Sequence, residues 1–247
     1  VARNPDGEID YNKFIAPLAD QSGAIQAIVL AIPFLRPSDV PYIQDAEDAY
    51  LDGIRELYQR ATQAATQFRS KHSPDIPIIA MGHLHLTGGE ESKDSERRLV
   101  VGGSEAVQIE IFPEQLDYVA LGHLHRPQEF RRGSIRYSGS PIPLSFTEIL
   151  YHHQTLRLEW TLTPRSQNPT FTITPILIPR LTQLMCIPES GFDVIESVLQ
   201  QLNNLELDAT LPPEEHPLLE VRVLEDHPDP TRRCRIEQAL LNKPVRL

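Results

Sequence analysis

The sequence contains little cysteine and no long apolar run, and each absence excludes a class of protein. Its two cysteines, Cys186 and Cys234, are far apart and form no CxxC pair, so they indicate reduced thiols rather than a disulfide framework or a zinc knuckle. No apolar run approaches the roughly 18–20 residues of a membrane-spanning helix, and no secretory signal is visible near the start. Because the sequence begins with Val1 rather than Met, we expect it to be a fragment of a longer protein.

Positive charge is also scarce. The sequence has 23 Lys and Arg residues against 34 Asp and Glu residues, which gives a net charge of −11 and argues against a protein that coats DNA. This balance does not exclude a nuclease, because bound divalent cations and a local basic patch can attract phosphate. With 247 residues, 40% of them hydrophobic and 23% charged, the composition fits a globular protein of one large or two modest domains.

Apolar stretches at regular intervals predict an α/β fold. Residues 24–31 and 76–81 are short apolar runs typical of buried strands. Between them, apolar residues recur at helical spacing over 46–68, which predicts an amphipathic helix lying on a sheet. Further strands are expected at 99–102, 107–111, 118–121, 135–137 and 156–162.

A polar segment with two prolines, residues 163–169, predicts a domain boundary. We therefore expect one domain at 1–165 and a second, small α/β domain at 166–247. In the second domain the pattern predicts a strand, a helix, a strand and a helix, at 171–178, 192–202, 218–224 and 231–241.

Two predicted strands run directly into a Gly-His pair, at Gly82-His83 and at Gly122-His123. Ligands in α/β sheets bind at the carboxyl ends of strands, and glycine before the histidine lets the backbone turn sharply. In an extended segment His123 and His125 point the same way, so both can face one site. Imidazole is a common ligand for zinc, manganese and iron. The pattern therefore predicts that His83, His123 and His125 bind metal.

A single Gly-His is more simply an ordinary loop residue, but two of them at strand ends favour metal binding. His85 creates a second Gly-His-Leu-His, yet we do not expect it to be a ligand. The other histidines in polar or proline-flanked contexts are expected to be exposed loop residues: His152, His153, His216 and His227.

A basic cluster follows the second Gly-His-Leu-His, interrupted by Glu129. It can grip a phosphate backbone or simply form a solvated face. Its members are Arg126, Arg131, Arg132 and Arg136.

The turn at residues 137–141, YSGSP, would bring backbone N–H groups and the hydroxyls of Ser138 and Ser140 close to the histidines. Such groups can hold a sugar-phosphate, and a purely structural tight turn is the alternative. We assign Arg126, Arg136, Ser138 and Ser140 as candidate DNA- or phosphate-binding residues.

Taken together, these segments resemble the SbcD family of nuclease subunits, bacterial double-strand-break-repair nucleases among the calcineurin-like metallophosphoesterases. The most specific runs are YVALGHLHRPQ and RYSGSPIPLSF; AIPFLRPSDV and LLNKPVRL are also similar, whereas GHLH alone indicates only a metallophosphoesterase. The resemblance covers nearly the whole chain. It implies that 1–165 is the C-terminal part of a metallophosphoesterase β-sandwich flanked by helices. It also implies that 166–247 is an α/β capping domain that guides DNA, incomplete at its end.

The resemblance further implies two divalent metals, Mn²⁺ or Mg²⁺, with His83 and His123 on one ion and His125 on the other. These ions would generate a hydroxide for two-metal phosphodiester hydrolysis. Family members pair with an SbcC-type ATPase and act on double-stranded DNA ends and hairpins as ATP-dependent 3′–5′ exonucleases and endonucleases in recombination, repair and replication. A homodimer and a cytoplasmic, nucleoid-associated location are implied by the same resemblance.

The sequence departs from the family in one large respect. The N-terminal motifs Asp-x-His, Gly-Asp-x-x-Asp and Gly-Asn-His-Asp, which supply a bridging carboxylate and the acid histidine, do not occur here. No catalytic acid is therefore assigned in this chain. Without the bridging carboxylate nothing offsets the repulsion between two cations. We expect the isolated chain to bind metal weakly and to be inactive, and the full-length parent to be active.

Two alternatives remain open from the sequence. The chain can belong to another calcineurin-like phosphoesterase, such as a phosphatase, or to a non-catalytic scaffold that binds the ATPase and DNA. A parent gene that also lacks the upstream motifs would favour the scaffold.

Overall fold

The computed structural model describes residues 1–73, 75–92, 106–161, 169–225 and 227–247. The chain divides into two compact units: one contains residues 1–141 and 152–178, and the other contains residues 142–151 and 179–247. The first unit is built on a six-stranded mixed sheet with the order β1-β2-β3-β4-β6-β5. Its strands are β1 (Ile15–Ala19), β2 (Ile25–Ala31), β3 (Ile78–His83), β4 (Tyr118–Gly122), β5 (Gln128–Phe130) and β6 (Ile135–Tyr137).

Strands β2, β3, β4 and β6 are parallel, while β1 and β5 are antiparallel edge strands. Short 3₁₀ turns join several of the elements of the chain. They are η1 (Tyr11–Phe14), η2 (Pro37–Asp39), η3 (Ile109–Ile111), η4 (Arg131–Gly133), η5 (Phe146–Glu148) and η6 (Pro213–Glu215).

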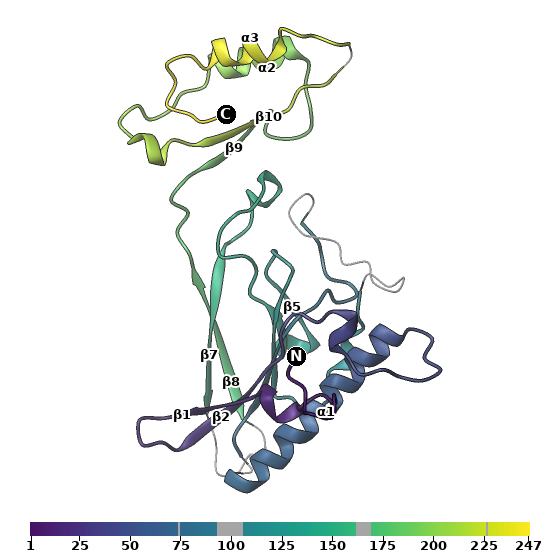
Figure 1. Ribbon diagram of the computed structural model, residues 1–247. Helices are drawn as coiled ribbons and strands as arrows, with labels where there is room; N and C mark the ends of the chain where they lie inside the picture. Colours follow the sequence, from purple (N-terminus) through teal and green to yellow (C-terminus); the bar gives the residue numbers. More distant parts are fainter. Residues whose placement is uncertain (74, 93–105, 162–168, 226) are drawn as a thin grey trace. The chain divides into compact units, whose positions relative to one another are not determined.

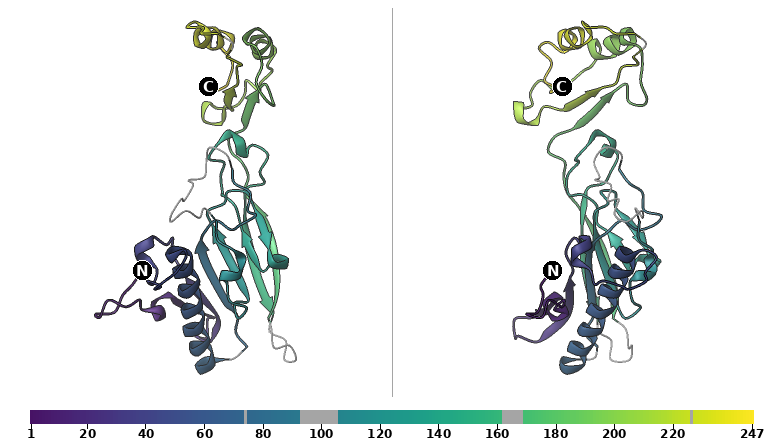
Figure 2. Two further views of the ribbon diagram at one scale, coloured as in Figure 1. Left: turned by 90° about the vertical axis from the view of Figure 1, so that its right-hand side faces the viewer. Right: turned by 45° about the vertical axis from the view of Figure 1, so that its right-hand side comes forward.

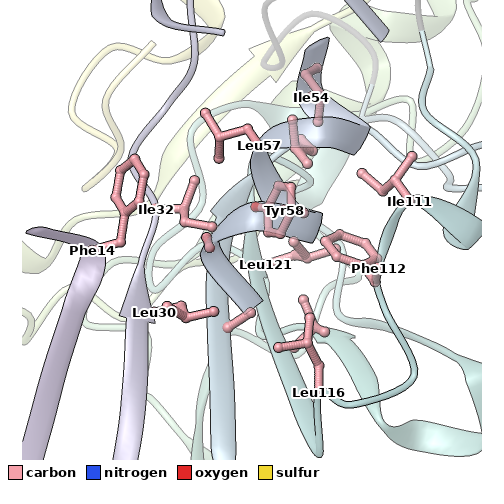
Figure 3. Close-up of a cluster of buried hydrophobic side chains, with 14 of the residues drawn as sticks. Phe14, Leu30, Ile32, Ile54, Leu57, Tyr58, Ile111, Phe112, Leu116 and Leu121 are labelled. Carbon is pink, nitrogen blue, oxygen red and sulfur yellow. The ribbon is translucent and has the colours of Figure 1, made fainter. Parts of the chain in front are cut away.

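Helix α1 (Ala49–His72) connects β2 to β3 and covers one face of the sheet (Figures 1 and 2). It begins where the Asp48 carboxylate accepts hydrogen bonds from the amides of Tyr50 and Leu51, which satisfies two N–H groups of the first turn. Its apolar stripe shares a buried core with Ile28 and Leu30 of β2, and Figure 3 shows Leu30 in this cluster. The stripe consists of Ile54, Leu57, Tyr58, Ala61 and Ala65, all fully buried.

The opposite face of the sheet packs against a two-stranded antiparallel sheet, β7 (Gln154–Thr161) and β8 (Thr170–Leu177), as Figure 2 shows. Because side chains alternate along a strand, Ile78 and Ala80 of β3 face the helix while Ile79 faces this second sheet. Trp160 and Phe171 supply much of its apolar surface. The result is a β-sandwich with a helix outside, which confirms the predicted fold class.

The second unit is a small α/β layer whose helices pack together on one side of a parallel strand pair (Figure 1). Its elements are β9 (Leu184–Ile187), α2 (Ile195–Asn203), β10 (Leu218–Val221) and α3 (Arg232–Ala239). Its buried apolar side chains are Ile187, Val198, Leu202, Leu219, Ile236 and Leu240. The predicted helices at 192–202 and 231–241 and the strand at 218–224 are present with shorter bounds.

The strand predictions differ from the structure in two respects, and one of them is not tested. The strand expected at 107–111 is absent: Val107 makes a single bridge to Leu86, and Ile109–Ile111 form η3, which turns Ile111 and Phe112 into the core. Strands β1, β5 and β9 were not predicted. The strand expected at 99–102 lies outside the described residues.

The predicted division at residues 165 and 166 differs from the compact units. The polar segment around it lies mostly outside the described residues, but β8 beyond it pairs with β7 along its whole length and so belongs to the first unit. The second unit contains residues 179–247 and also 142–151. Across the described parts of the chain, no helix combines the length and apolar character needed to cross a membrane.

Candidate metal centre

The two Gly-His pairs lie side by side at one edge of the sheet. Strands β3 and β4 are parallel neighbours, and His83, the last residue of β3, is the register partner of Gly122. His123 follows directly, so the imidazole centroids of His83 and His123 are 5.3 Å apart, with an angle of 73° between the rings. The ring of Phe34 packs edge-on against His83 from the loop after β2, at 5.8 Å. The predicted convergence of these two histidines at the carboxyl end of the sheet is present.

Both glycines serve close packing rather than a sharp turn, which corrects the role expected from the sequence. A Cβ on Gly82 would lie 2.2 Å from the buried hydroxyl oxygen of Tyr58, and a Cβ on Gly122 would lie 3.0 Å from Nδ1 of His83. The Tyr58 hydroxyl donates to the Met81 carbonyl, 3.1 Å away. Glycine is therefore required at these positions so that helix α1 and the His83 ring can approach the two strand ends.

His123 has a backbone conformation that side chains rarely adopt. Its φ is +106°, although it carries a Cβ. Conformations of this kind cost about 1–3 kcal/mol and persist where the surrounding structure imposes them, often at functional sites. The strain at His123 therefore points to a requirement for this ring in this place.

His85 also lies beside His123, although the sequence analysis does not include His85 in the site. The two ring centroids are 5.9 Å apart. Nδ1 of His85 lies 3.2 Å from a carboxylate oxygen of Glu91, a residue that sequence reasoning missed. The structure therefore places three histidines and one carboxylate together at this edge of the sheet.

The electrostatics of the cluster favour neutral imidazoles. Burial, with smaller contributions from His83 and His85, lowers the pKa of His123 to about 4. Burial, followed by the nearby His125, lowers the pKa of His83 below its ordinary value. Both rings are therefore neutral at pH 7, and the neutral ring is the form that binds a metal ion.

His125 is fixed through its backbone by the turn at residues 137–141. Its carbonyl oxygen accepts a 3.0 Å hydrogen bond from the Ser140 amide. Gly139, at φ +84°, has no room for a side chain, since a Cβ there would lie 2.7 Å from the same oxygen. The His125 ring is close enough to affect the pKa of both His83 and His123. The predicted turn thus positions the second Gly-His-Leu-His segment.

The donor set fits a divalent metal only in part. Within the described ranges, no three His, Cys, Asp or Glu side chains converge closely enough to hold one ion by themselves. Neutral imidazole nitrogens suit zinc or iron, whereas manganese and magnesium need additional oxygen ligands. Taken alone, the described side chains therefore do not complete a metal site.

The basic cluster is largely engaged in ion pairs and structural hydrogen bonds. Arg126 pairs with Glu90, and Nη2 of Arg136 lies 2.8 Å from Glu129. Arg131 donates to the backbone carbonyls of Ile109 and Phe112 and so anchors η3. The side chain of Arg131 therefore has a structural role, and Arg136 shares such a role in part because its Nε donates to the Gly133 carbonyl at 3.0 Å. Arg126 forms its ion pair at the surface.

The two serines of the turn differ in exposure. Ser138 is half-buried and makes only a 3.4 Å contact with the Gly139 carbonyl. Ser140 is buried, and its hydroxyl lies 3.3 Å from Nδ1 of His153. His153 is therefore a buried partner of the turn, which corrects its expected place among exposed loop histidines. The expected exposure is found at His152 and His227, while His216 is half-buried.

Tyr137 is a further site residue that the sequence prediction missed. Its buried hydroxyl donates to the Leu84 carbonyl at 2.6 Å and accepts from the Leu86 amide at 3.0 Å. These two residues flank His85, so Tyr137 of β6 fixes the backbone of the first Gly-His-Leu-His segment. Leu86 and Leu84 are 51 and 53 residues from Tyr137 along the chain, so only the folded structure reveals this role.

A metallophosphoesterase-type protein is the class that the sandwich and its strand-end histidines define. The SbcD component of the nuclease SbcCD from Rhodobacter capsulatus is 36% identical over 250 residues, an alignment that covers 100% of this chain and 59% of the relative. The SbcD proteins of Escherichia coli K12 and Bacillus subtilis are 40% identical over 141 residues and 43% over 101 residues. These alignments cover 53% and 40% of this chain, and 34% and 26% of the relatives.

The chain thus spans less than two thirds of the length of the curated relatives it matches. No family model matches it. The similarity to the R. capsulatus protein nevertheless extends over the whole chain, and the chain belongs to the SbcD family of nuclease subunits.

Proposed function

We propose that the parent protein hydrolyses DNA phosphodiester bonds at a two-metal centre to which this chain contributes His83, His123 and His125. One observation carries the proposal: two neutral imidazoles meet at the carboxyl ends of adjacent parallel strands, 5.3 Å apart between ring centroids. The membership of the chain in a family of nuclease subunits supports the same activity.

Mn²⁺ or Mg²⁺, when bound, would polarise a phosphate and lower the pKa of a water nucleophile. The residues of this chain would hold the metal ions and orient the groups around them. His83 and His123 present neutral nitrogens at the sheet edge. The Tyr58 hydroxyl, packed against Gly82 and bonded to the Met81 carbonyl, anchors the end of β3 to helix α1. His125 is held by the Ser140 amide for the second ion. The proposal requires a bridging carboxylate and an acid histidine that this chain does not supply, so they would have to come from outside it.

The remaining residues suit a role in holding DNA. Arg126 lies in an exposed ion pair, which contributes little stability and exchanges readily, so it can turn from Glu90 to a phosphate oxygen. Arg136 is more buried and its Nε also donates to the Gly133 carbonyl, so only its Nη2, now paired with Glu129, would be offered to a phosphate. Ser138 offers a hydroxyl. The second unit would act as the capping domain that guides DNA.

The proposal extends to the assembly. The name SbcCD of the relatives supports a complex with an SbcC-type partner. From the family resemblance alone we extend the proposal to an ATPase partner, to double-stranded DNA ends and hairpins as substrates, and to ATP-dependent exonuclease and endonuclease cleavage. The same resemblance is our basis for proposing a homodimer, a cytoplasmic, nucleoid-associated location and a role in recombination, repair and replication.

The test compares the full-length parent with single variants on linear duplex DNA and on p-nitrophenyl phosphate, with Mn²⁺. His83→Ala and His123→Ala should abolish cleavage of DNA. His152→Ala removes an exposed histidine outside the cluster and should leave cleavage unchanged. The isolated 247-residue chain should be inactive.

The same experiment separates the alternatives. Faster turnover of p-nitrophenyl phosphate than of DNA would assign the parent to the general phosphoesterases. DNA binding without hydrolysis of either substrate would assign it to the scaffolds, and it would refute the nuclease proposal.

A further inference from the structure

We propose that Glu91 and His85 form a positioning pair that orients the His123 ring in the metal centre. The inference rests on the proposed function, because it assigns a task to two residues around a ring that would hold the metal. The three side chains form a short series: the Glu91 carboxylate lies 3.2 Å from Nδ1 of His85, and the His85 ring lies against that of His123 with centroids 5.9 Å apart.

The backbone of His85 is fixed from two directions. Tyr137 bonds the Leu84 carbonyl and the Leu86 amide on either side of it. The His85 carbonyl itself accepts a 2.8 Å hydrogen bond from the Val107 amide. The backbone of His85 is therefore held on both sides, which restricts the positions that its ring can reach.

The loop that carries Glu91 is fixed in the same manner from β5. The side-chain amide of Gln128 accepts from the Glu90 amide at 2.7 Å and donates to the Glu90 carbonyl at 2.9 Å. Gly89 brings the loop close, because a Cβ there would lie 2.5 Å from Leu124 and 3.5 Å from the His85 ring. The carboxylate therefore meets Nδ1 of His85 at a defined place.

His123 needs such a support. Its φ of +106° is unfavourable, so neighbouring contacts must hold the residue in place. The ring of His85, tied to Glu91, packs on one side of the His123 ring, and His83 packs on another. Loss of an outer partner that is hydrogen-bonded to a metal-binding residue lowers metal affinity by about 10- to 100-fold. His85 contacts the His123 ring by packing, so we expect an effect at the lower end of that range.

The test measures Mn²⁺ binding to the full-length parent by electron paramagnetic resonance. His85→Ala should raise the Mn²⁺ dissociation constant by about tenfold, and Glu91→Ala should do so by less. Glu91→Gln should restore affinity because its amide oxygen still accepts the Nδ1–H. The double variant should bind no more weakly than His85→Ala alone, since the two residues act through one contact. His152→Ala is the matched histidine control.

A second readout uses the metal-free parent, in which the imidazole ¹H–¹⁵N signals of His123 should shift in His85→Ala and Glu91→Ala but not in His152→Ala. Unchanged signals and unchanged Mn²⁺ affinity in His85→Ala, with affinity lost in His83→Ala, would overturn this inference alone. Fully additive losses in the double variant would also overturn it. Unchanged affinity in both His83→Ala and His123→Ala would instead overturn the proposed metal centre, and this inference with it.

Discussion

The hydroxyl of Tyr137 donates a 2.6 Å hydrogen bond to the carbonyl oxygen of Leu84, a contact that joins β6 to the loop between His83 and His85. The same hydroxyl accepts from the Leu86 amide. One buried side chain thus satisfies two backbone groups of this loop, which also forms an isolated bridge from Leu86 to Val107. The Tyr137 residue also begins the turn whose Ser140 amide holds His125. Both Gly-His-Leu-His segments are therefore positioned from the end of one short strand.

Tyr137→Phe tests this connection. The substitution preserves the ring in the core but leaves the Leu84 carbonyl and the Leu86 amide without their partner, and a buried unsatisfied group costs about 1–3 kcal/mol. We expect the free energy of unfolding of the chain to fall by about that amount in urea titrations, and Mn²⁺ binding by the parent to weaken. Tyr42→Phe, at an 85% exposed tyrosine, is the control and should change neither. Equal stability of the two variants would contradict the assignment.

Gly82→Ala tests the close approach of α1 to β3. The new Cβ would lie 2.2 Å from the Tyr58 hydroxyl oxygen, inside the packed core. We expect the variant to lose about 1–3 kcal/mol of unfolding free energy, as overpacked cores do.

The control for that prediction is the double variant that combines Gly82→Ala with Tyr58→Phe. Removal of the hydroxyl leaves the ring carbon of residue 58, at 3.5 Å, and Leu121, at 3.2 Å, as the nearest neighbours of the new Cβ. Gly82→Ala should therefore lower the free energy of unfolding less in the Tyr58→Phe background than in the unsubstituted sequence. A double-mutant cycle measures this coupling. Additive effects would show that the hydroxyl is not the obstacle.

The sequence predicted the elements whose pattern is strong. Helix α1 was expected at 46–68 and is found at Ala49–His72, because its apolar stripe is long and Asp48 caps its start. Strands β2, β3 and β4 are continuous apolar runs and were expected close to their actual bounds. The segment at 107–111 alternates like a strand, but its Ile109 carbonyl accepts from the Phe112 amide in a 3₁₀ turn, so alternation alone was misleading. The domain boundary predicted at 163–169 falls mostly outside the described residues, while the strands before and after it, β7 and β8, pair with each other.

The site was predictable only where a local motif carries it. His83 and His123 follow strands and glycines, and the structure brings them together. Glu91, Tyr137 and Phe34 were missed because no local pattern marks them; their contacts join segments that meet only after the sheet has formed. Arg131 was grouped with the basic cluster because sequence cannot distinguish a solvent-facing arginine from one that donates to the backbone of η3.

Asp117 gives a pH-dependent prediction away from the histidines. Its carboxylate accepts a 2.8 Å hydrogen bond from the Ile78 amide and lies 3.7 Å from Arg69. Burial outweighs both contacts and raises the pKa of Asp117 above 3.8. At pH values between the pKa of Asp117 in the unfolded chain and its higher pKa in the folded protein, the folded state binds more protons than the unfolded state. The contribution of Asp117 to stability therefore falls as pH rises through this range.

Asp117→Asn removes this titration while its amide oxygen still accepts from Ile78. We expect the stability of Asp117→Asn relative to the parent sequence to increase as pH rises from about 3 to 7, measured by urea unfolding. Asp117→Ala, which leaves the Ile78 amide without an acceptor, should be less stable than Asp117→Asn throughout. A difference between Asn and Asp that decreases with pH would show that the ion pair with Arg69 dominates.

The strain at His123 can be measured by comparing two substitutions that both remove the imidazole. His123→Gly and His123→Ala abolish the same ring contacts, but only glycine adopts a φ of +106° without cost. We expect the glycine variant to be more stable than the alanine variant by about 1 kcal/mol in metal-free urea unfolding, even though glycine is the more flexible residue in the unfolded chain. The same pair made at His152, an exposed residue without positive φ, should show the opposite order. Equal or greater stability of His123→Ala would mean that the backbone relaxes once the ring is gone, so that the ring itself, held by His83 and His85, imposes the conformation.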